Sequence, residues 1–171
     1  MIKLYEQDLL PFFEPDAWHV IQQACEIRQK SLNLIDMILD YDQCLLTDSL
    51  DSILGFLADV SKALADSFTE DSFVPVQYIC CMTLRFRVWY QKLDDLTRHF
   101  SPHKLLRECG FSFRSLYFSC RALDELLSSW FSDTISLNPD IDFLSGDYQH
   151  TCFAPLPPDL EIDFDSSHYI L

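Results

Sequence analysis

The stretch that decides the fold is PVQYICCMTLRFRVWYQKLDDLTRHF, residues 75–100. Its large apolar side chains follow one another in alternating steps of three and four residues: Ile79, Met82, Phe86, Trp89, Leu93, Leu96 and Phe100. This spacing places them along one side of an α-helix and predicts a continuous hydrophobic stripe. Because one helix cannot bury such a stripe alone, we expect other helices of the chain to pack against it.

Three further long segments show the same helical period. The first is expected to begin near Pro15, because proline suits the first turn of a helix, and its predicted buried stripe is Trp18, Ile21, Cys25, Leu32, Ile35 and Leu39. The second has Leu50, Ile53, Leu57, Val60, Leu64 and Phe68 on one side. The last, over residues 112–131, has Phe113, Leu116, Cys120, Leu123, Leu127 and Trp130.

Between the third and the last of these segments we expect a short extra helix over residues 102–109. Ser101 is a candidate cap for this helix, and Gly110 would end it in the left-handed conformation. Short connections make neighbouring helices antiparallel. The predicted fold is therefore all-α, an antiparallel four-helix bundle with one short extra helix and an acidic, aromatic-containing C-terminal tail.

Charge is distributed unevenly along the chain, whose formal net charge is −15. Residues 1–84 contain 14 acidic and 4 basic residues, residues 85–121 contain 3 and 8, and residues 122–171 contain 10 and none. An acidic protein repels the phosphates of nucleic acid, so we expect no direct nucleic-acid binding. The basic middle segment nonetheless predicts a local cationic face.

These patterns divide the chain into an N-terminal arm over 1–14, a helical bundle domain over 15–131 and an acidic, partly ordered tail over 132–171. The tail combines acidic residues with many aromatic and aliphatic ones, which is typical of a segment that binds a partner. It could instead fold back on the basic segment, or remain solvated. The predicted partner-binding residues are Phe143, Tyr148, Phe153, Leu160, Phe164, Tyr169 and Leu171 in the tail, and Arg85, Arg87, Arg98 and Arg114 in the basic segment.

Motifs of enzymatic chemistry are missing from the sequence. Only three glycines occur, and neither GxxxxGK nor GxGxxG is present, which argues against nucleotide binding by those loops. The chain contains no HExxH, ExxH or CxxC, so we expect no metal site, no cofactor and no catalytic residues. An enzyme of unrecognised type is kept as an alternative, because nucleophile and base can meet only in the fold.

No run of 18 apolar residues and no signal-like amino terminus are visible, so we predict no membrane span and an intracellular location, cytoplasmic or nuclear. The seven cysteines are interpreted as reduced thiols. From composition and charge we predict a non-catalytic protein–protein interaction module, an adaptor or regulator with a protein partner. Self-association into a homo-oligomer is left open.

Two short leucine patterns suggest other interpretations. Leu50, Leu54, Leu57, Ala58 and Asp59 resemble the death-motif helix of apoptosis regulators, and the chain length is similar to that of the Bcl-2 family, although Ser61 departs from the motif. This resemblance implies an apoptosis-regulator-like helical protein as the alternative function. The LDELL sequence at 123–127 matches the LxxLL pattern, but Leu123 and Leu127 lie on the predicted core stripe and are interpreted as core.

Overall fold

The protein is described by a computed structural model over residues 14–69 and 76–137, and the structural statements that follow refer to these residues. They form four α-helices: α1 (Glu14–Ile38), α2 (Leu45–Ser67), α3 (Val76–His99) and α4 (Lys104–Leu137). No strand occurs among them. The all-α prediction is therefore confirmed. None of the four helices is both long and apolar enough to cross a membrane.

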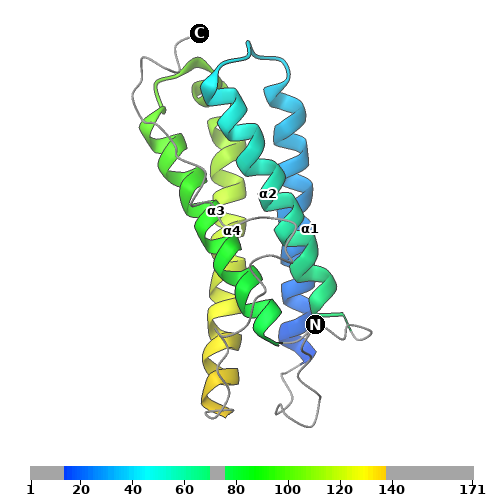
Figure 1. Cartoon of the computed structure of the whole chain (residues 1–171). Helices are drawn as coiled ribbons and strands as arrows, with labels where there is room; N and C mark the ends of the chain where they lie inside the picture. Colours follow the sequence, from blue (N-terminus) through cyan, green and yellow to red (C-terminus); the bar gives the residue numbers. More distant parts are fainter. Residues whose placement is uncertain (1–13, 70–75, 138–171) are drawn as a thin grey trace.

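The four helices lie side by side around one hydrophobic core (Figure 1). Helix α1 packs against α2 and α4, and α3 packs against the same two helices. The turn from α1 to α2 and the turn from α3 to α4 lie at the same end of the molecule (Figure 1). Every helix thus buries one side against two neighbours.

Three of the four predicted stripes form the core. All the residues assigned to the stripes of α2, α3 and the last helix are buried, and none is more than 5% exposed. Trp89 and Trp130 have the largest side chains among them, and the Trp89 ring stacks on Phe56 of α2 with 4.5 Å between the ring centroids. The alternating spacing therefore identified the inner side of these helices correctly.

The stripe predicted for α1 is wrong at Trp18, Cys25 and Leu39, whereas Ile21 and Ile35 are partly buried against the core. Trp18 and Leu39 are 64% and 65% exposed, and Cys25 is also exposed. The buried side is displaced by about one position along the chain: Ala17, Val20, Ala24, Ile27, Ser31, Leu34 and Ile38. Ala17, Ala24 and Ser31 recur every seven residues, and such small side chains let a helix approach its neighbours closely. Close packing, rather than the size of Trp18, selects the inner side.

The short extra helix and the terminating role of Gly110 are also wrong, because α4 continues without interruption from Lys104 through Gly110 to Leu137. Leu105, Leu106 and Cys109 are buried in the same core as Phe113. Their burial outweighs the cost of about 1 kcal/mol for a glycine inside a helix. The cap is not Ser101, since the Nδ1 atom of His103 accepts a hydrogen bond from the backbone N–H of Leu105 at 3.2 Å.

Candidate functional site

The side of α4 that faces away from the core alternates basic and aromatic residues. Six exposed residues follow one another in steps of three and four: Lys104, Arg107, Phe111, Arg114, Phe118 and Arg121. Phe111 is 78% exposed and Phe118 is 63% exposed. Because the steps alternate between three and four residues, the six side chains lie along one side of the helix. We call this set the α4 face.

Two exposed phenylalanines on one helix side are costly for a protein that does not bind anything there. A phenylalanine side chain that is buried instead of exposed gains about 1.5–3 kcal/mol, and Phe111 and Phe118 forgo most of this gain. Single exposed apolar residues are common, but aromatic residues interleaved with arginines are the composition enriched in protein interfaces. The α4 face is therefore a candidate docking surface.

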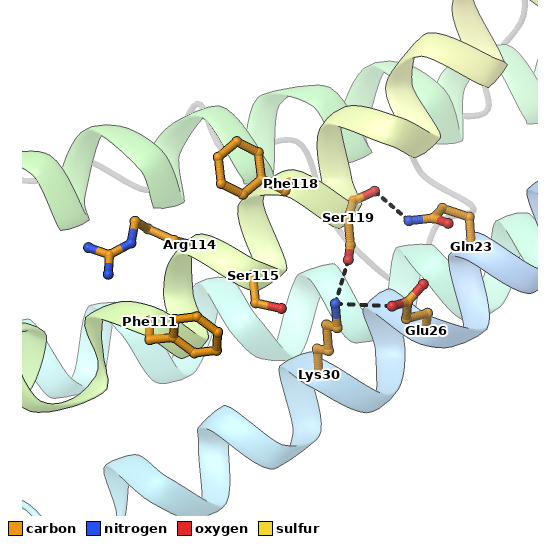
Figure 2. A pocket seen from close by; sticks show the side chains of 8 residues that line it. All are labelled: Gln23, Glu26, Lys30, Phe111, Arg114, Ser115, Phe118 and Ser119. Atoms are coloured by element: carbon orange, nitrogen blue, oxygen red, sulfur yellow. Dashed lines mark hydrogen bonds and ion pairs between the residues drawn. The ribbon is translucent and has the colours of Figure 1, made fainter.

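A groove of about 430 Å³ lies beside the α4 face, between α1 and α4 (Figure 2). Its wall on α4 includes Phe111, Arg114 and Phe118. Its remaining lining residues are Gln23, Glu26, Lys30, Ser115 and Ser119. Figure 2 shows the Arg114 side chain directed away from Lys30 and Ser119. The groove thus combines an aromatic wall with positive charge.

Polar contacts across the groove join α1 to α4. The Lys30 Nζ atom donates a hydrogen bond to Ser119 Oγ at 2.7 Å and forms an ion pair with Glu26 at 3.0 Å. The Gln23 side-chain amide donates to the backbone carbonyl of Ser119 at 3.1 Å. Ser119 itself is buried. These contacts hold the two helices in register and shape the floor of the groove.

A lysine hydrogen-bonded to a serine can form a base and nucleophile pair in hydrolases. Here, however, Lys30 donates its hydrogen to Ser119 and is already paired with Glu26. Ser119 lies within α4, where backbone N–H groups are bonded to carbonyls of the preceding turn and cannot stabilise an oxyanion. The arrangement is suited to linking two helices and offers no developed acyl-transfer geometry.

The arginines predicted to contact a partner do not share one surface. Arg85 lies in the core and is 1% exposed, so direct partner contact would require α3 to open. Arg87 forms an ion pair with Asp124 of α4 at 2.9 Å, and Arg98 pairs with Asp94 of its own helix at 3.0 Å. Only Arg114 belongs to the α4 face and to the groove. The predicted basic face is therefore divided between structural contacts and the α4 face.

The tail residues of the prediction lie outside the described residues: Phe143, Tyr148, Phe153, Leu160, Phe164, Tyr169 and Leu171. The leucine patterns lie within them. Leu123 and Leu127 are fully buried, which agrees with their interpretation as core. Leu54 and Leu57 of the death-motif-like stretch are fully buried as well. Docking through those leucines would remove them from the core.

Other titratable groups have structural surroundings. The Tyr90 hydroxyl donates to Asp124 at 2.9 Å, and burial followed by this hydrogen bond raises the pKa of Tyr90. Hydrogen bonds to Glu108 and Cys109 raise the pKa of Tyr41. Burial raises the pKa of the Cys80 and Cys120 thiols, which disfavours the reactive thiolate. Within the described ranges, no group of three or more His, Cys, Asp or Glu residues could hold a metal ion.

Several residues of the site escaped the sequence prediction, namely Phe111 and Phe118 on α4 and Gln23 and Lys30 on α1. A signal for the α4 residues was present, because Arg107, Arg114 and Arg121 are spaced by seven residues and so are Phe111 and Phe118. The expected break at Gly110 concealed it. No comparable signal connects Lys30 with Ser119, which lies 89 residues away.

The described residues thus define an all-helical protein with a basic and aromatic surface on its last helix. No protein-family model, no curated protein and no solved structure matches the chain. The function must therefore be argued from the site itself.

Proposed function

We propose that the protein is a non-catalytic interaction module that binds an acidic segment of a partner protein through the α4 face. The observation that carries this proposal is the exposure of Phe111 and Phe118, 78% and 63%, between basic residues on one side of α4. The groove shared with α1 extends this surface, and its lysine, Lys30, is already paired with Glu26. The four helices would act as an antiparallel bundle that holds the surface in shape.

Binding would use two kinds of contact. Apolar side chains of the partner would cover Phe111 and Phe118 and remove them from water, which is the main favourable contribution. Carboxylates of the partner would pair with Arg107 and Arg114, since guanidinium groups bind carboxylates through two parallel hydrogen bonds. Charge complementarity would speed association and select acidic partners.

The same charges argue against other occupants. Two copies of the α4 face would bring arginine against arginine, and like charges in contact disfavour association. Single-stranded nucleic acid also binds surfaces on which aromatic and arginine residues alternate. The net charge of −15, however, opposes a polyanion of many phosphates more strongly than a short peptide with a few carboxylates. An acidic peptide segment is therefore the favoured ligand, and the tail over 132–171 remains a second proposed contact of the protein with partners.

The test is a selection of random peptides displayed on phage, with the full chain as bait. We expect the selected peptides to be rich in Asp, Glu and large apolar residues. By fluorescence anisotropy, the double substitution Phe111→Ser and Phe118→Ser should weaken their binding at least about tenfold, equivalent to about 1.4 kcal/mol. The affinity for a labelled single-stranded oligonucleotide is measured in parallel. If the protein binds the oligonucleotide more tightly than any selected peptide, the proposal is contradicted.

Matched controls separate the α4 face from general charge and hydrophobicity. Arg114→Glu should weaken peptide binding, whereas Arg28→Glu, the same charge change at an exposed position of α1, should leave it unchanged. Trp18→Ser removes an exposed aromatic side chain of α1 and should also have no effect. Equal losses in all three variants, or selected peptides without acidic residues, would refute the proposed site.

A further inference from the structure

We infer that residues 159–165 of the same chain, DLEIDFD, dock on the α4 face and compete with the partner for it. This inference rests on the proposed function of that face. The segment lies outside the described residues, and its sequence, its charge and the length of chain that connects it to α4 support this docking.

The charges of the segment and of the α4 face are complementary. Asp159, Glu161, Asp163 and Asp165 give this segment four acidic residues and no basic one, and no other window of seven residues in the chain contains four acidic residues. The α4 face carries four basic residues, one of which, Arg121, also lies 4.0 Å from Glu125. The most acidic short segment of the protein would therefore meet its exposed basic and aromatic helix side.

The alternation of residue types in the segment also matches the α4 face. In the segment, acidic residues alternate with Leu160, Ile162 and Phe164, so an extended chain would carry carboxylates along one edge and apolar side chains along the other. On the α4 face, the phenylalanines and the arginines likewise form two neighbouring rows. At about 100° per residue, Phe111 lies about 40–60° nearer to the α1 side of α4 than Arg107 and Arg114. The apolar edge would cover the phenylalanines and the groove, and the acidic edge would meet the arginines.

The dimensions of the two surfaces agree. Six steps of an extended chain, from Asp159 to Asp165, span about 20 Å at 3.3 Å per residue. Fourteen helical steps, from Arg107 to Arg121, span about 21 Å at 1.5 Å per residue. One short segment can therefore lie along the whole row of arginines.

The connecting chain is long enough for docking within one molecule. Helix α4 ends at Leu137, and the 22 residues from there to Asp159 can span at most about 73 Å. The return distance along α4 from Leu137 to Arg107 is about 45 Å. Attachment to the same chain over this length would give an effective concentration of the order of millimolar, so even a weak contact would compete with a partner.

The test uses the full chain with the photo-crosslinking residue p-benzoylphenylalanine in place of Phe118, followed by mass spectrometry of the crosslinked peptides. We expect crosslinks to the peptide that contains residues 159–165, with a yield unchanged by tenfold dilution and reduced in high salt. The same probe in place of Trp18, exposed on another helix, is the control. Absence of this crosslink, an equal yield from the control position, or a yield that falls on dilution would overturn docking within one molecule.

A second measurement separates this inference from the proposed function. Neutralising the segment with Asp159→Asn, Glu161→Gln, Asp163→Asn and Asp165→Asn should abolish the crosslink and tighten binding of a selected acidic peptide by about tenfold. Neutralising three other tail acids with Asp140→Asn, Asp142→Asn and Asp147→Asn should change neither. Equal peptide affinities before and after neutralisation of 159–165 would overturn the inference and leave the proposed function intact. Absence of peptide binding in every variant would overturn the proposed function.

Discussion

The sharpest prediction compares two phenylalanines that lie two residues apart on α4. Phe113 is 4% exposed and belongs to the core, whereas Phe111 is 78% exposed. Phe113→Ala should therefore remove buried contacts and leave a cavity, at a cost of about 3–5 kcal/mol in the free energy of unfolding. Phe111→Ala removes the same atoms from the surface and should change the free energy of unfolding by no more than about 0.5 kcal/mol.

The assay is urea unfolding of the full-length proteins, followed by circular dichroism and by tryptophan fluorescence. Trp89 and Trp130 are buried and report on loss of the core. We expect a lower midpoint and an unchanged slope for Phe113→Ala, since the slope follows the surface exposed on unfolding. For a protein of this size, the same difference lowers the melting temperature by about 6–20 °C. Phe111→Ala should have the same melting temperature as the parent protein.

The result that would refute the reasoning is an equal loss of stability in both variants. Such a result would mean that Phe111 is covered in solution by structure that belongs to the fold, and the α4 face would then be core. Phe118→Ala gives an independent repeat, because Phe118 is 63% exposed and seven residues further along the same side. A stability loss above about 2 kcal/mol in this variant would contradict the proposed docking surface as well.

Three further predictions concern the ends and contacts of the helices. Gly110→Ala should stabilise the protein by about 0.5–1 kcal/mol, because the added Cβ would meet only the Arg114 Nη1 atom, at 3.8 Å. A lower melting temperature of this variant would instead indicate that a helix ends at Gly110. Burial, followed by the charge of Arg107, lowers the pKa of His103 below 6.5, so the capping contribution of His103 should be complete above pH 6.5 and lost as the pH falls through the lowered pKa. The difference in unfolding free energy between the protein and His103→Asn, measured with urea from pH 8 to pH 5, should therefore fall with the pH. A constant difference would exclude this role. Asp124→Asn should lower the free energy of unfolding by about 1–3 kcal/mol, since Asp124 accepts hydrogen bonds from Tyr90 and Arg87. The control Asp95→Asn, at an exposed position of α3, should leave the free energy of unfolding unchanged. Equal effects in urea unfolding would rule out a stabilising role of the Asp124 hydrogen bonds.

In the helices that the sequence predicted well, the large apolar residues form one continuous stripe. In α3 this stripe runs from Ile79 to Phe100 in steps of three and four residues. Helix α1 is different, because Trp18, Ile21 and Leu32 form a second apolar side next to the small residues Ala17 and Ala24. Periodicity cannot choose between two such sides, and the larger residues were the wrong choice.

Part of the candidate site was within reach of the sequence and part was not. Arg114 was predicted as a contact residue, and it does lie on the α4 face. Arg85 was predicted as well, but a residue type does not reveal burial, and it lies in the core. Phe111 and Phe118 were overlooked, because Gly110 was interpreted as a helix end and the repeat of seven residues was divided at that point.

The sequence alone determined that the chain is helical and which side of α2, α3 and α4 is apolar, because these properties depend on residues within one or two turns of each other. Only the tertiary structure decided which side of α1 is buried, that α4 continues past Gly110, and that Lys30 meets Ser119 across a groove. These outcomes depend on contacts between residues far apart in the chain. The free energy of burying Leu105 and Cys109 overrides a weak local signal such as a single glycine.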